Sequence, residues 1–398
     1  MSALHRLWQL LPRDLRREAL FGAMARLAPR PDRPAPDGRG PVTVAGYFGA
    51  PTGLGAAARR LVAVLRLAGF EPVEADLTGP LRQGPPGPPP RVPEGPGTLL
   101  LHVNGPMLPW AMRVLGRCAV AGKRLVAVWN WELPVLPRDW ERGFGFAHAI
   151  WVSSHFTAAA MRRPAGPPVS VLPIAVPEPD PAPLDRAAFG LPADAFVALS
   201  VFDASSSIAR KNPLAAIAAH RAAFGDRPDR ILLLKTHGTA AAGPAWGEVA
   251  AAAAMAPNVR ILDRTLNRRE LWALQLACDC FLSLHRSEGF GLGIAEAMRA
   301  GRPVVATGWS GNMDFMPCEG TVAVPYDLVP ARDPQHTYDL PGAQWAEARI
   351  GEAAAALAAL AEDPARRAAM GAAAREAAAR RLAPQVVAGN VKELLPRN

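Results

Sequence analysis

The sequence predicts an α/β protein of two domains that face each other across a cleft, followed by a C-terminal helical segment. The chain has 398 residues, which is long for one compact core. From Val42 onward, strand and helix patterns alternate, as in a mostly parallel sheet with helices on both faces. A proline-rich stretch at 173–185 interrupts the alternation, which then starts again. We therefore place the domain boundary in this stretch, between residues 178 and 179.

Residues 1–40 are predicted to form a basic amphipathic helix and a linker. In residues 3–28, leucines, a tryptophan and a phenylalanine alternate with arginines, and the proline-rich stretch 29–41 follows. Such a helix can simply pack on the body of the protein. Because basic residues together with Trp and Leu also suit an anionic interface, the alternative is peripheral contact with a membrane surface.

The first domain is predicted over residues 41–178. The Pro- and Gly-rich stretch 79–97 is expected to be a surface loop, because its composition cannot build a core. The strands are expected at Val42–Gly46, Pro72–Asp76, Thr98–Val103, Arg124–Trp129 and Ala149–Ser153.

The second domain is predicted over residues 179–365. Beyond Trp345 the chain is Ala-rich and helical, and residues 366–398 are expected to form helices that could pack back on the first domain. Two such Rossmann-like domains would bind a ligand between them, at the carboxyl ends of strands. The strands are expected at Phe196–Phe202, Ile231–Lys235, Val259–Leu262, Cys280–Leu284 and Pro303–Thr307.

The composition argues against several classes of protein. No run of 18 or more uncharged apolar residues predicts a transmembrane helix, and we expect no secretory signal. The net charge of +9 comes almost wholly from arginine, without the basic stripe and interleaved aromatics of a nucleic-acid-binding protein. The four cysteines lack zinc-ligand spacing. We therefore expect reduced thiols in a cytoplasmic protein, one that could lie peripherally at the inner membrane surface.

The most informative motif is a pair of carboxylates, Glu288 and Glu296, eight residues apart. A strand pattern runs into the motif and a short helix pattern runs out of it. Backbone N–H groups at that helix N-terminus can bind an anion. The motif therefore suits a ligand with both phosphate and hydroxyl groups, such as a nucleotide sugar. Its candidate binding residues between the two acids are Gly289, Phe290, Gly291 and Leu292.

Cationic residues follow two strands of the same domain. Only four lysines occur in the chain; Lys211 lies beyond the end of the first strand, and Lys235 ends the next one. Arg210 precedes Lys211. Positive charge at these strand ends suits a diphosphate, although each residue could also be solvated surface.

Small, polar and aromatic residues also follow strands of the first domain, where they would face the cleft. Trp131 could stack on a sugar ring or pack in the core. Glu132 is harder to explain as a core residue, because an unpaired buried carboxylate is costly. The candidates are Gly53, Gly55, Asn104, Trp131, Glu132 and His155.

These segments, in this order, resemble retaining glycosyltransferases with two Rossmann-like domains, the GT-B fold of glycosyltransferase family 4, or group 1. The resemblance is strongest over residues 196–316. It rests on the two-glutamate motif, on Arg-Lys-Asn-Pro at 210–213 and on Thr-Gly-Trp-Ser-Gly-Asn at 307–312. Trp-Glu-Leu-Pro at 131–134 and Ile-Trp-Val-Ser-Ser-His-Phe-Thr at 150–157 resemble the first domain of one subgroup.

The resemblance implies roles for the donor side of the cleft. Glu288 would hold hydroxyls of the donor sugar, and Glu296 would hold the ribose of the nucleotide. Backbone N–H groups near Gly291 and Leu292 would bind the diphosphate. Lys211, helped by Arg210, would neutralise the departing nucleoside diphosphate, so no metal would be required.

Two positions depart from the pattern of the family. Many members have an arginine where this chain has Phe202 and Asp203, and Arg210 could take its place. Many members also have a cleft histidine where this chain has Asn104. His102 lies two residues earlier, on the same face of the strand but deeper. The donor half of the cleft would also include Lys235, Gly53 and Gly55. The acceptor half, for which the candidates are Asn104, Trp131, Glu132 and His155, is therefore less well defined than the donor half.

We therefore expect a retaining glycosyltransferase that moves a hexose from GDP- or UDP-hexose to a saccharide or lipid-linked acceptor. Likeness to a subgroup favours mannose and bacterial polysaccharide or glycan synthesis. The alternatives are a nucleotide-sugar epimerase or a non-catalytic sugar-nucleotide-binding protein on the same fold. A phosphorylase would need a pyridoxal-phosphate lysine, and none is convincingly placed.

Overall fold

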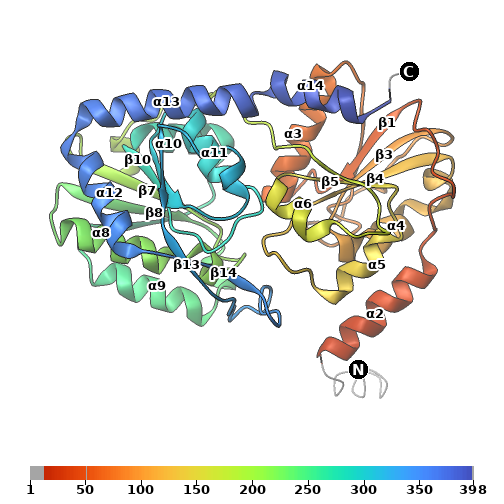
Figure 1. Ribbon diagram of the computed structural model, residues 1–398, viewed down its shortest axis with the longest axis horizontal. Helices are drawn as coiled ribbons and strands as arrows, with labels where there is room; N and C mark the ends of the chain where they lie inside the picture. Colours follow the sequence, from red (N-terminus) through yellow and green to blue (C-terminus); the bar gives the residue numbers. More distant parts are fainter. Residues whose placement is uncertain (1–12, 51, 397–398) are drawn as a thin grey trace.

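The protein consists of two α/β domains, each built on a six-stranded parallel sheet (Figure 1). The computed structural model describes residues 13–50 and 52–396. A long helical segment at the C-terminus runs along one side of both domains. The predicted α/β class with two Rossmann-like domains is therefore confirmed.

The first sheet has the strand order β2-β1-β3-β4-β5-β6. Apolar residues of α3 (Gly53–Leu67) cover one face, and those of α4 (Leu108–Val120) and α5 (Glu141–Phe144) cover the other. Helix α6 (His155–Met161) follows the fifth strand. The strands are β1 (Val42–Gly46), β2 (Val73–Asp76), β3 (Gly97–His102), β4 (Lys123–Trp129), β5 (Ala149–Val152) and β6 (Val169–Val171).

The second sheet has the strand order β12-β11-β10-β7-β8-β9. Five of its strands match predicted ones within about a residue or two. The strands are β7 (Phe196–Val201), β8 (Arg230–Thr236), β9 (Val259–Asp263), β10 (Cys280–Ser283), β11 (Val304–Thr307) and β12 (Thr321–Val324). The helices on its faces are α7 (Ile208–Lys211), α8 (Pro213–Phe224), α9 (Pro244–Ala254), α10 (Arg268–Ala277), α11 (Leu292–Arg299) and α12 (Ile350–Glu362).

The second domain also carries an antiparallel hairpin that the sequence patterns do not predict. Its strands are β13 (Tyr326–Pro330) and β14 (Gln344–Ala348), joined by the loop 331–343. The hairpin belongs to neither parallel sheet, and it reaches toward the first domain (Figure 1). We call residues 326–348 the hairpin arm.

The C-terminal helices connect the two domains. Helix α13 (Pro364–Leu382) packs on α11 of the second domain, and α14 (Pro384–Leu394) packs on α3 of the first. Val387 and Val391 of α14 are buried in the same apolar cluster as residues of α3. The chain therefore returns to its first domain at the end.

Helix α2 (Arg13–Leu27) projects at the edge of the first domain (Figure 1). It packs on α4, with the ring of Phe21 6.3 Å from that of Trp110, and Arg17 pairs with Asp139 at 2.5 Å. The predicted helix 3–28 also includes residues 3–12, which lie outside the described part. No helix of residues 13–50 and 52–396 has the length and apolarity needed to cross a bilayer.

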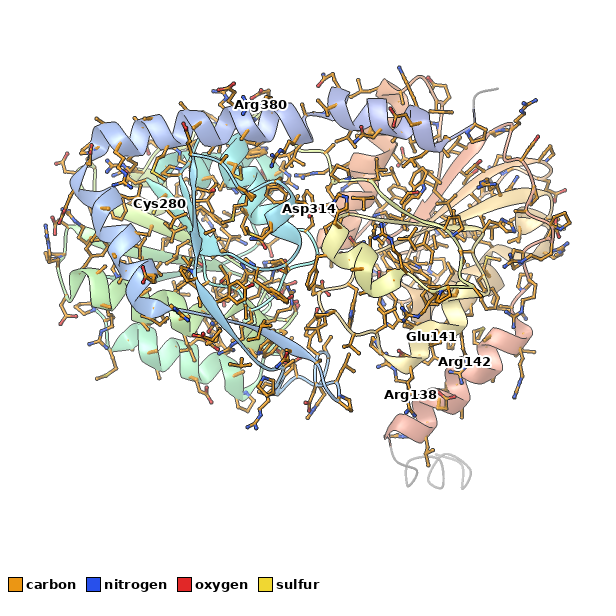
Figure 2. The ribbon with its side chains drawn as sticks, in the orientation of Figure 1. Arg138, Glu141, Arg142, Cys280, Asp314 and Arg380 are labelled. Atoms are coloured by element: carbon orange, nitrogen blue, oxygen red, sulfur yellow. The ribbon has the colours of Figure 1, made fainter. Side chains whose placement is uncertain are left out.

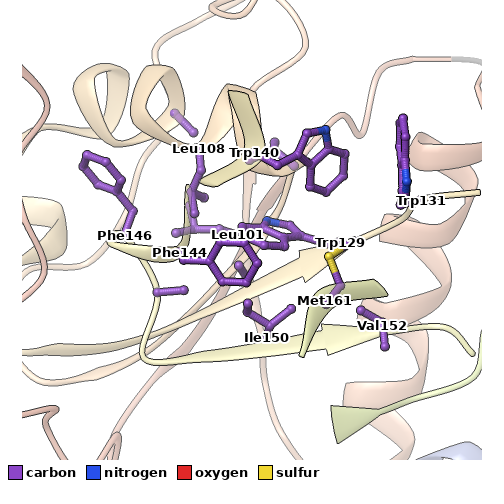
Figure 3. Packing of buried hydrophobic residues seen from close by; sticks show 14 of the residues in the cluster. Leu101, Leu108, Trp129, Trp131, Trp140, Phe144, Phe146, Ile150, Val152 and Met161 are labelled. Carbon is purple, nitrogen blue, oxygen red and sulfur yellow. The ribbon is translucent and has the colours of Figure 1, made fainter. Parts of the chain in front are cut away.

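The core of the first domain is rich in tryptophan. Trp129 lies edge-on to Trp140 and Phe144, with ring centroids 5.5 and 5.0 Å apart (Figure 3). Trp131 is also mostly buried, and its ring lies 5.3 Å from that of Trp140. Trp131 was expected either to stack on a sugar ring or to pack in the core. Packing in the core covers most of its surface.

Candidate active site

A cavity of about 460 Å³ lies between the two domains. It is lined by loops that follow strands of both sheets, as expected for ligands at the carboxyl ends of parallel strands. The predicted residues that line it are Gly53, Asn104, Trp131, Glu132, Arg210, Lys211, Glu288, Gly289, Phe290, Gly291 and Leu292.

The loop that carries Glu288 is held in a conformation that small residues permit. Gly291 has φ 88°, in the left-handed region, and directly precedes α11. Ser310 has φ 79°, which is rare for a residue with a side chain, and its hydroxyl accepts a hydrogen bond from the Glu288 backbone N–H at 2.8 Å. The strained turn thus places a polar group where it fixes the position of Glu288.

Glu288 forms an ion pair with both predicted cations. Its Oε1 lies 2.5 Å from Lys211 Nζ and 3.2 Å from Arg210 Nη1. The short helix α7 presents both residues; the Ser207 hydroxyl caps this helix, which ends at Asn212 in a left-handed conformation. Arg210 therefore supplies positive charge in the cavity, where many members of the resembling family have an arginine nearer the strand.

Burial and charge act in opposite directions on this pair. Burial alone would raise the pKa of Glu288, but Lys211 and Arg210 outweigh it and lower that pKa to about 2. Burial lowers the pKa of Lys211, and Glu288 opposes that shift. At neutral pH the carboxylate is ionised and the geometry is that of a charge-assisted hydrogen bond.

The lowered pKa of Glu288 predicts a contribution to stability that depends on pH. The contribution is fully present above the ordinary glutamate pKa of 4.5 and is lost as the pH falls from there toward 2. The free energy of unfolding should therefore fall less between pH 7 and pH 4 in Glu288→Gln than in the wild type. The difference between the two falls should be on the order of 1 kcal/mol. Urea unfolding at the two pH values measures this difference. The exposed Glu94→Gln should leave it unchanged; equal pH dependence in wild type and Glu288→Gln would contradict the pairing.

Glu296 is buried and does not line the cavity, and it also binds two arginines. Arg60 of α3 contacts its Oε1 at 2.5 Å, and Arg268 of α10 contacts the same oxygen. Arg60 Nη1 also donates to the Ala175 carbonyl at 3.2 Å. The predicted ribose carboxylate is thus tied to the first domain, so a ribose hydroxyl that binds Oε1 must share or displace these arginines.

Removal of the Arg60 side chain should weaken the contact between the domains. We expect Arg60→Ala to lower the free energy of unfolding by about 1–3 kcal/mol, because a hydrogen bond between buried charged groups is lost. Arg66→Ala on the same helix is the matched control, since its pair with Glu74 is exposed and contributes about 0.5 kcal/mol. Urea unfolding tests the comparison, and equal effects of the two substitutions would show that the Arg60–Glu296 pair adds nothing.

Backbone and hydroxyl groups join the domains next to Glu288. The Gly289 carbonyl accepts hydrogen bonds from Ser154 Oγ at 2.5 Å and Thr157 Oγ1 at 3.2 Å. A Cβ at Gly289 would lie 2.7 Å from the Trp131 carbonyl oxygen, so the close approach requires glycine. Both domains therefore fix the position of this loop.

Besides Glu296, three predicted site residues lie outside the cavity lining. His155 is 74% exposed and contacts Asp314 of the second domain at 3.0 Å; Asp314 lies between the domains in Figure 2. Gly55 packs α3 against the preceding turn, because a Cβ there would lie 2.3 Å from the Ala50 carbonyl oxygen. Lys235 is buried, with its Nζ 3.4 Å from His237 Nδ1.

Three residues at or near the site are not among the residues predicted from the sequence. His285 is fully buried, and its Nε2 lies 3.0 Å from Asn312 Oδ1, below the loop of Glu288. Its place in Leu-His-Arg-Ser-Glu, directly before the acidic motif, could have identified it. Arg60 and Tyr338 reach the site from elements far away in sequence, and no local pattern predicts this.

One family model matches the chain. Residues 226–339 match the family described as "Glycosyl transferases group 1", and the matched segment contains both Glu288 and Glu296. The matched segment, residues 226–339, is therefore similar to the group 1 glycosyltransferases. No curated protein sequence matches the chain.

Several solved structures share the two-domain fold of this chain. Sucrose-phosphate synthase of Thermosynechococcus elongatus is 17% identical, with a TM-score of 0.64 over 89% of this chain and 98% of that one. Anabaena Alr3699/HepE in complex with UDP and glucose is 15% identical, with a TM-score of 0.59 over 89% and 98%. Staphylococcus aureus TarM is 10% identical, with a TM-score of 0.55 over 75% of this chain. The chain spans only 55% of that TarM chain and 56% of the pneumococcal O-GlcNAc transferase GtfA. These similarities confirm the GT-B fold.

Proposed function

We propose that this protein is a group 1 glycosyltransferase that moves a hexose from a nucleotide sugar to a hydroxyl of a saccharide or lipid-linked acceptor, with retention of configuration. The observation that carries the proposal is the group of Lys211, Arg210 and Glu288 in a cavity between two Rossmann-like domains. Two fixed cations beside an anion-binding helix N-terminus match the charge of a nucleoside diphosphate.

In the proposed reaction, the bond between the anomeric carbon and the diphosphate oxygen breaks while a bond to the acceptor oxygen forms on the same face. The acceptor proton passes to the departing phosphate, so no separate base is needed. Lys211 and Arg210 stabilise the charge that develops on the leaving group. Since they supply this positive charge, the proposal includes no metal ion.

Glu288 and Glu296 divide the donor between them in this proposal. Glu288 accepts hydrogen bonds from hydroxyls of the sugar, and its ion pair keeps the carboxylate charged for that task. Glu296 accepts from the ribose. Backbone N–H groups of Gly291 and Leu292, where α11 begins, bind the diphosphate.

Two observations bear on which nucleotide sugar is the donor. The solved complexes of HepE and TarM contain UDP, which favours a UDP-sugar, whereas likeness to a subgroup favours mannose and hence GDP-mannose. We propose a UDP- or GDP-hexose, and polysaccharide or glycan synthesis in the cytoplasm as the setting.

A panel of UDP-, GDP- and ADP-sugars tests this function. We expect at least one to raise the melting temperature and to release nucleoside diphosphate, with and without EDTA. No response to any donor would contradict the transferase proposal. Conversion of a donor to another nucleotide sugar would indicate an epimerase, and binding without turnover would indicate a non-catalytic protein.

We also propose that helix α2 makes peripheral contact with the inner membrane surface. Leu15, Leu20 and Leu27 of this helix are exposed, as is Arg26, and exposed leucines beside a basic residue suit an anionic interface. Cosedimentation with phosphatidylglycerol vesicles should fall when residues 1–30 are deleted and when Leu20 and Leu27 are replaced by serine. Unchanged binding in both variants would exclude this helix as the membrane contact.

A further inference from the structure

The hairpin arm places a tyrosine of the second domain against the first domain. Four residues of the arm belong to the same apolar cluster as Trp131 and Trp140: Ala331, Tyr338, Ala343 and Trp345. Thr337 and Tyr338 line the cavity. The arm is therefore part of the cavity wall on the side of the first domain.

The tip of the arm is fixed to the helix that carries Arg210 and Lys211. The buried Asp333 carboxylate accepts hydrogen bonds from Ser207 Oγ at 3.0 Å and from the backbone N–H of Tyr338 at 3.1 Å. Gln335 Oε1 accepts from the Ile208 N–H at 2.8 Å. The start of α7 and the tip of the arm thus satisfy each other's polar groups.

The base of the arm is fixed as well. Glu347 on β14 accepts hydrogen bonds from Arg286 Nε at 2.6 Å and Asn212 Nδ2 at 3.0 Å. The guanidinium of Arg286 lies 5.5 Å from the ring of Trp345. An arm tied at both ends can position a side chain with the accuracy that ligand recognition requires.

Tyr338 lies between the catalytic cations and the loop after β4. It is 5% exposed; its hydroxyl donates to Glu132 Oε2 at 2.9 Å, and its ring lies 5.2 Å from the Arg210 guanidinium carbon. Burial raises the pKa of this tyrosine well above its ordinary value, so the hydroxyl keeps its proton and remains a donor. Tyr338 therefore holds one oxygen of Glu132 in place.

The other groups beside this contact have unused hydrogen-bonding capacity. Among the described residues, Glu132 Oε1 has no hydrogen-bond partner, and neither does the buried Asn130 Nδ2. Both residues line the cavity, and only Trp131 separates them in the sequence. The carboxylate oxygen only accepts and the amide nitrogen only donates, so each can bind a hydroxyl of a sugar.

We propose that Glu132, held by Tyr338 of the hairpin arm, and Asn130 bind the hydroxyls of a pyranoside acceptor. This inference rests on the proposed function and assigns its acceptor subsite. The second domain then contributes to acceptor binding through the arm, so acceptor and donor sites are linked through the contact of Tyr338 with Arg210.

The test compares two kinetic constants in two variants that keep the shape of the side chain, Tyr338→Phe and Glu132→Gln. Release of nucleoside diphosphate from the active donor is measured in buffer and with methyl and p-nitrophenyl pyranosides as acceptors. We expect the KM for the glycoside to rise about 10-fold or more in both variants, as for a lost hydrogen bond to a charged group. The KM for the donor should change less than about 2-fold.

Tyr326→Phe is the matched control, because this tyrosine lies at the base of the same arm with its ring 5.4 Å from Trp309. It should leave both constants at wild-type values. A glycoside KM that is unchanged in both test variants overturns the inference, and so does donor turnover that no glycoside stimulates in the wild type. Absence of release from every donor would instead contradict the proposed function itself, and the acceptor subsite with it.

Discussion

Lys211→Ala is expected to lower the turnover of the donor by about 10²–10³-fold, the usual cost of removing one preorganised group that stabilises charge in the transition state. Lys211 Nζ lies 2.5 Å from Glu288 Oε1, so the substitution also removes one of the two cations that pair with this buried carboxylate, beside the proposed position of the donor sugar. Repulsion between that carboxylate and a diphosphate adds to the loss. Initial rates of nucleoside diphosphate release measure the effect.

Lys392→Ala is the control for this prediction, because Lys392 is exposed on α14, far along the chain from the cavity. It should retain the wild-type rate. If Lys211→Ala turns over within about 3-fold of the wild-type rate, Lys211 does not stabilise the leaving group.

Gly311→Ala is expected to reduce both stability and activity. A Cβ at Gly311 would lie 2.1 Å from the Gly289 carbonyl oxygen and 2.9 Å from that of Glu288, and both are backbone atoms. Relief of this overlap must move the loop that carries Glu288 and break its contacts with Ser154 and Thr157. We expect a loss of about 2 kcal/mol or more in the free energy of unfolding, as for overpacked cores, and a large fall in turnover.

Gly351→Ala is the matched substitution for comparison. Gly351 lies in α12, and a Cβ there would have no atom of the described structure within 4 Å. Alanine should stabilise this helix by about 0.5–1 kcal/mol and leave turnover unchanged. Urea unfolding and rate measurements on both variants check the contrast, and a stable, active Gly311→Ala enzyme would contradict the packing of the loop.

The regular part of the fold follows from local patterns. The strand Val42–Gly46 occurs as predicted, because short apolar runs between turn signals mark buried parallel strands. Strand β6 has only three residues, which is too short for a recognisable pattern. Strand β12 is only partly buried, so it lacks the apolar run of a buried strand. The hairpin arm was not predicted because its long loop holds proline, aspartate and glycine, and tertiary contacts fix it.

The proposed donor half of the site is more predictable than the proposed acceptor half, for a physical reason. Glu288 and Glu296 lie on one strand–loop–helix unit, and Lys211 follows the neighbouring strand, so sequence spacing places them. Arg60 and Tyr338 reach the site only through the packing of the two domains against each other. That arrangement depends on contacts such as Tyr338 with Glu132, which no local pattern encodes.

A crystal structure with the nucleoside diphosphate of the active donor tests the central claim most directly. We expect the diphosphate within hydrogen-bond distance of Lys211 Nζ and of the backbone N–H groups of Gly291 and Leu292. The ribose hydroxyls should lie at Glu296, with Arg60 moved from its present position at Oε1. A nucleotide bound away from Lys211, or with its ribose distant from Glu296, would contradict the assigned donor site.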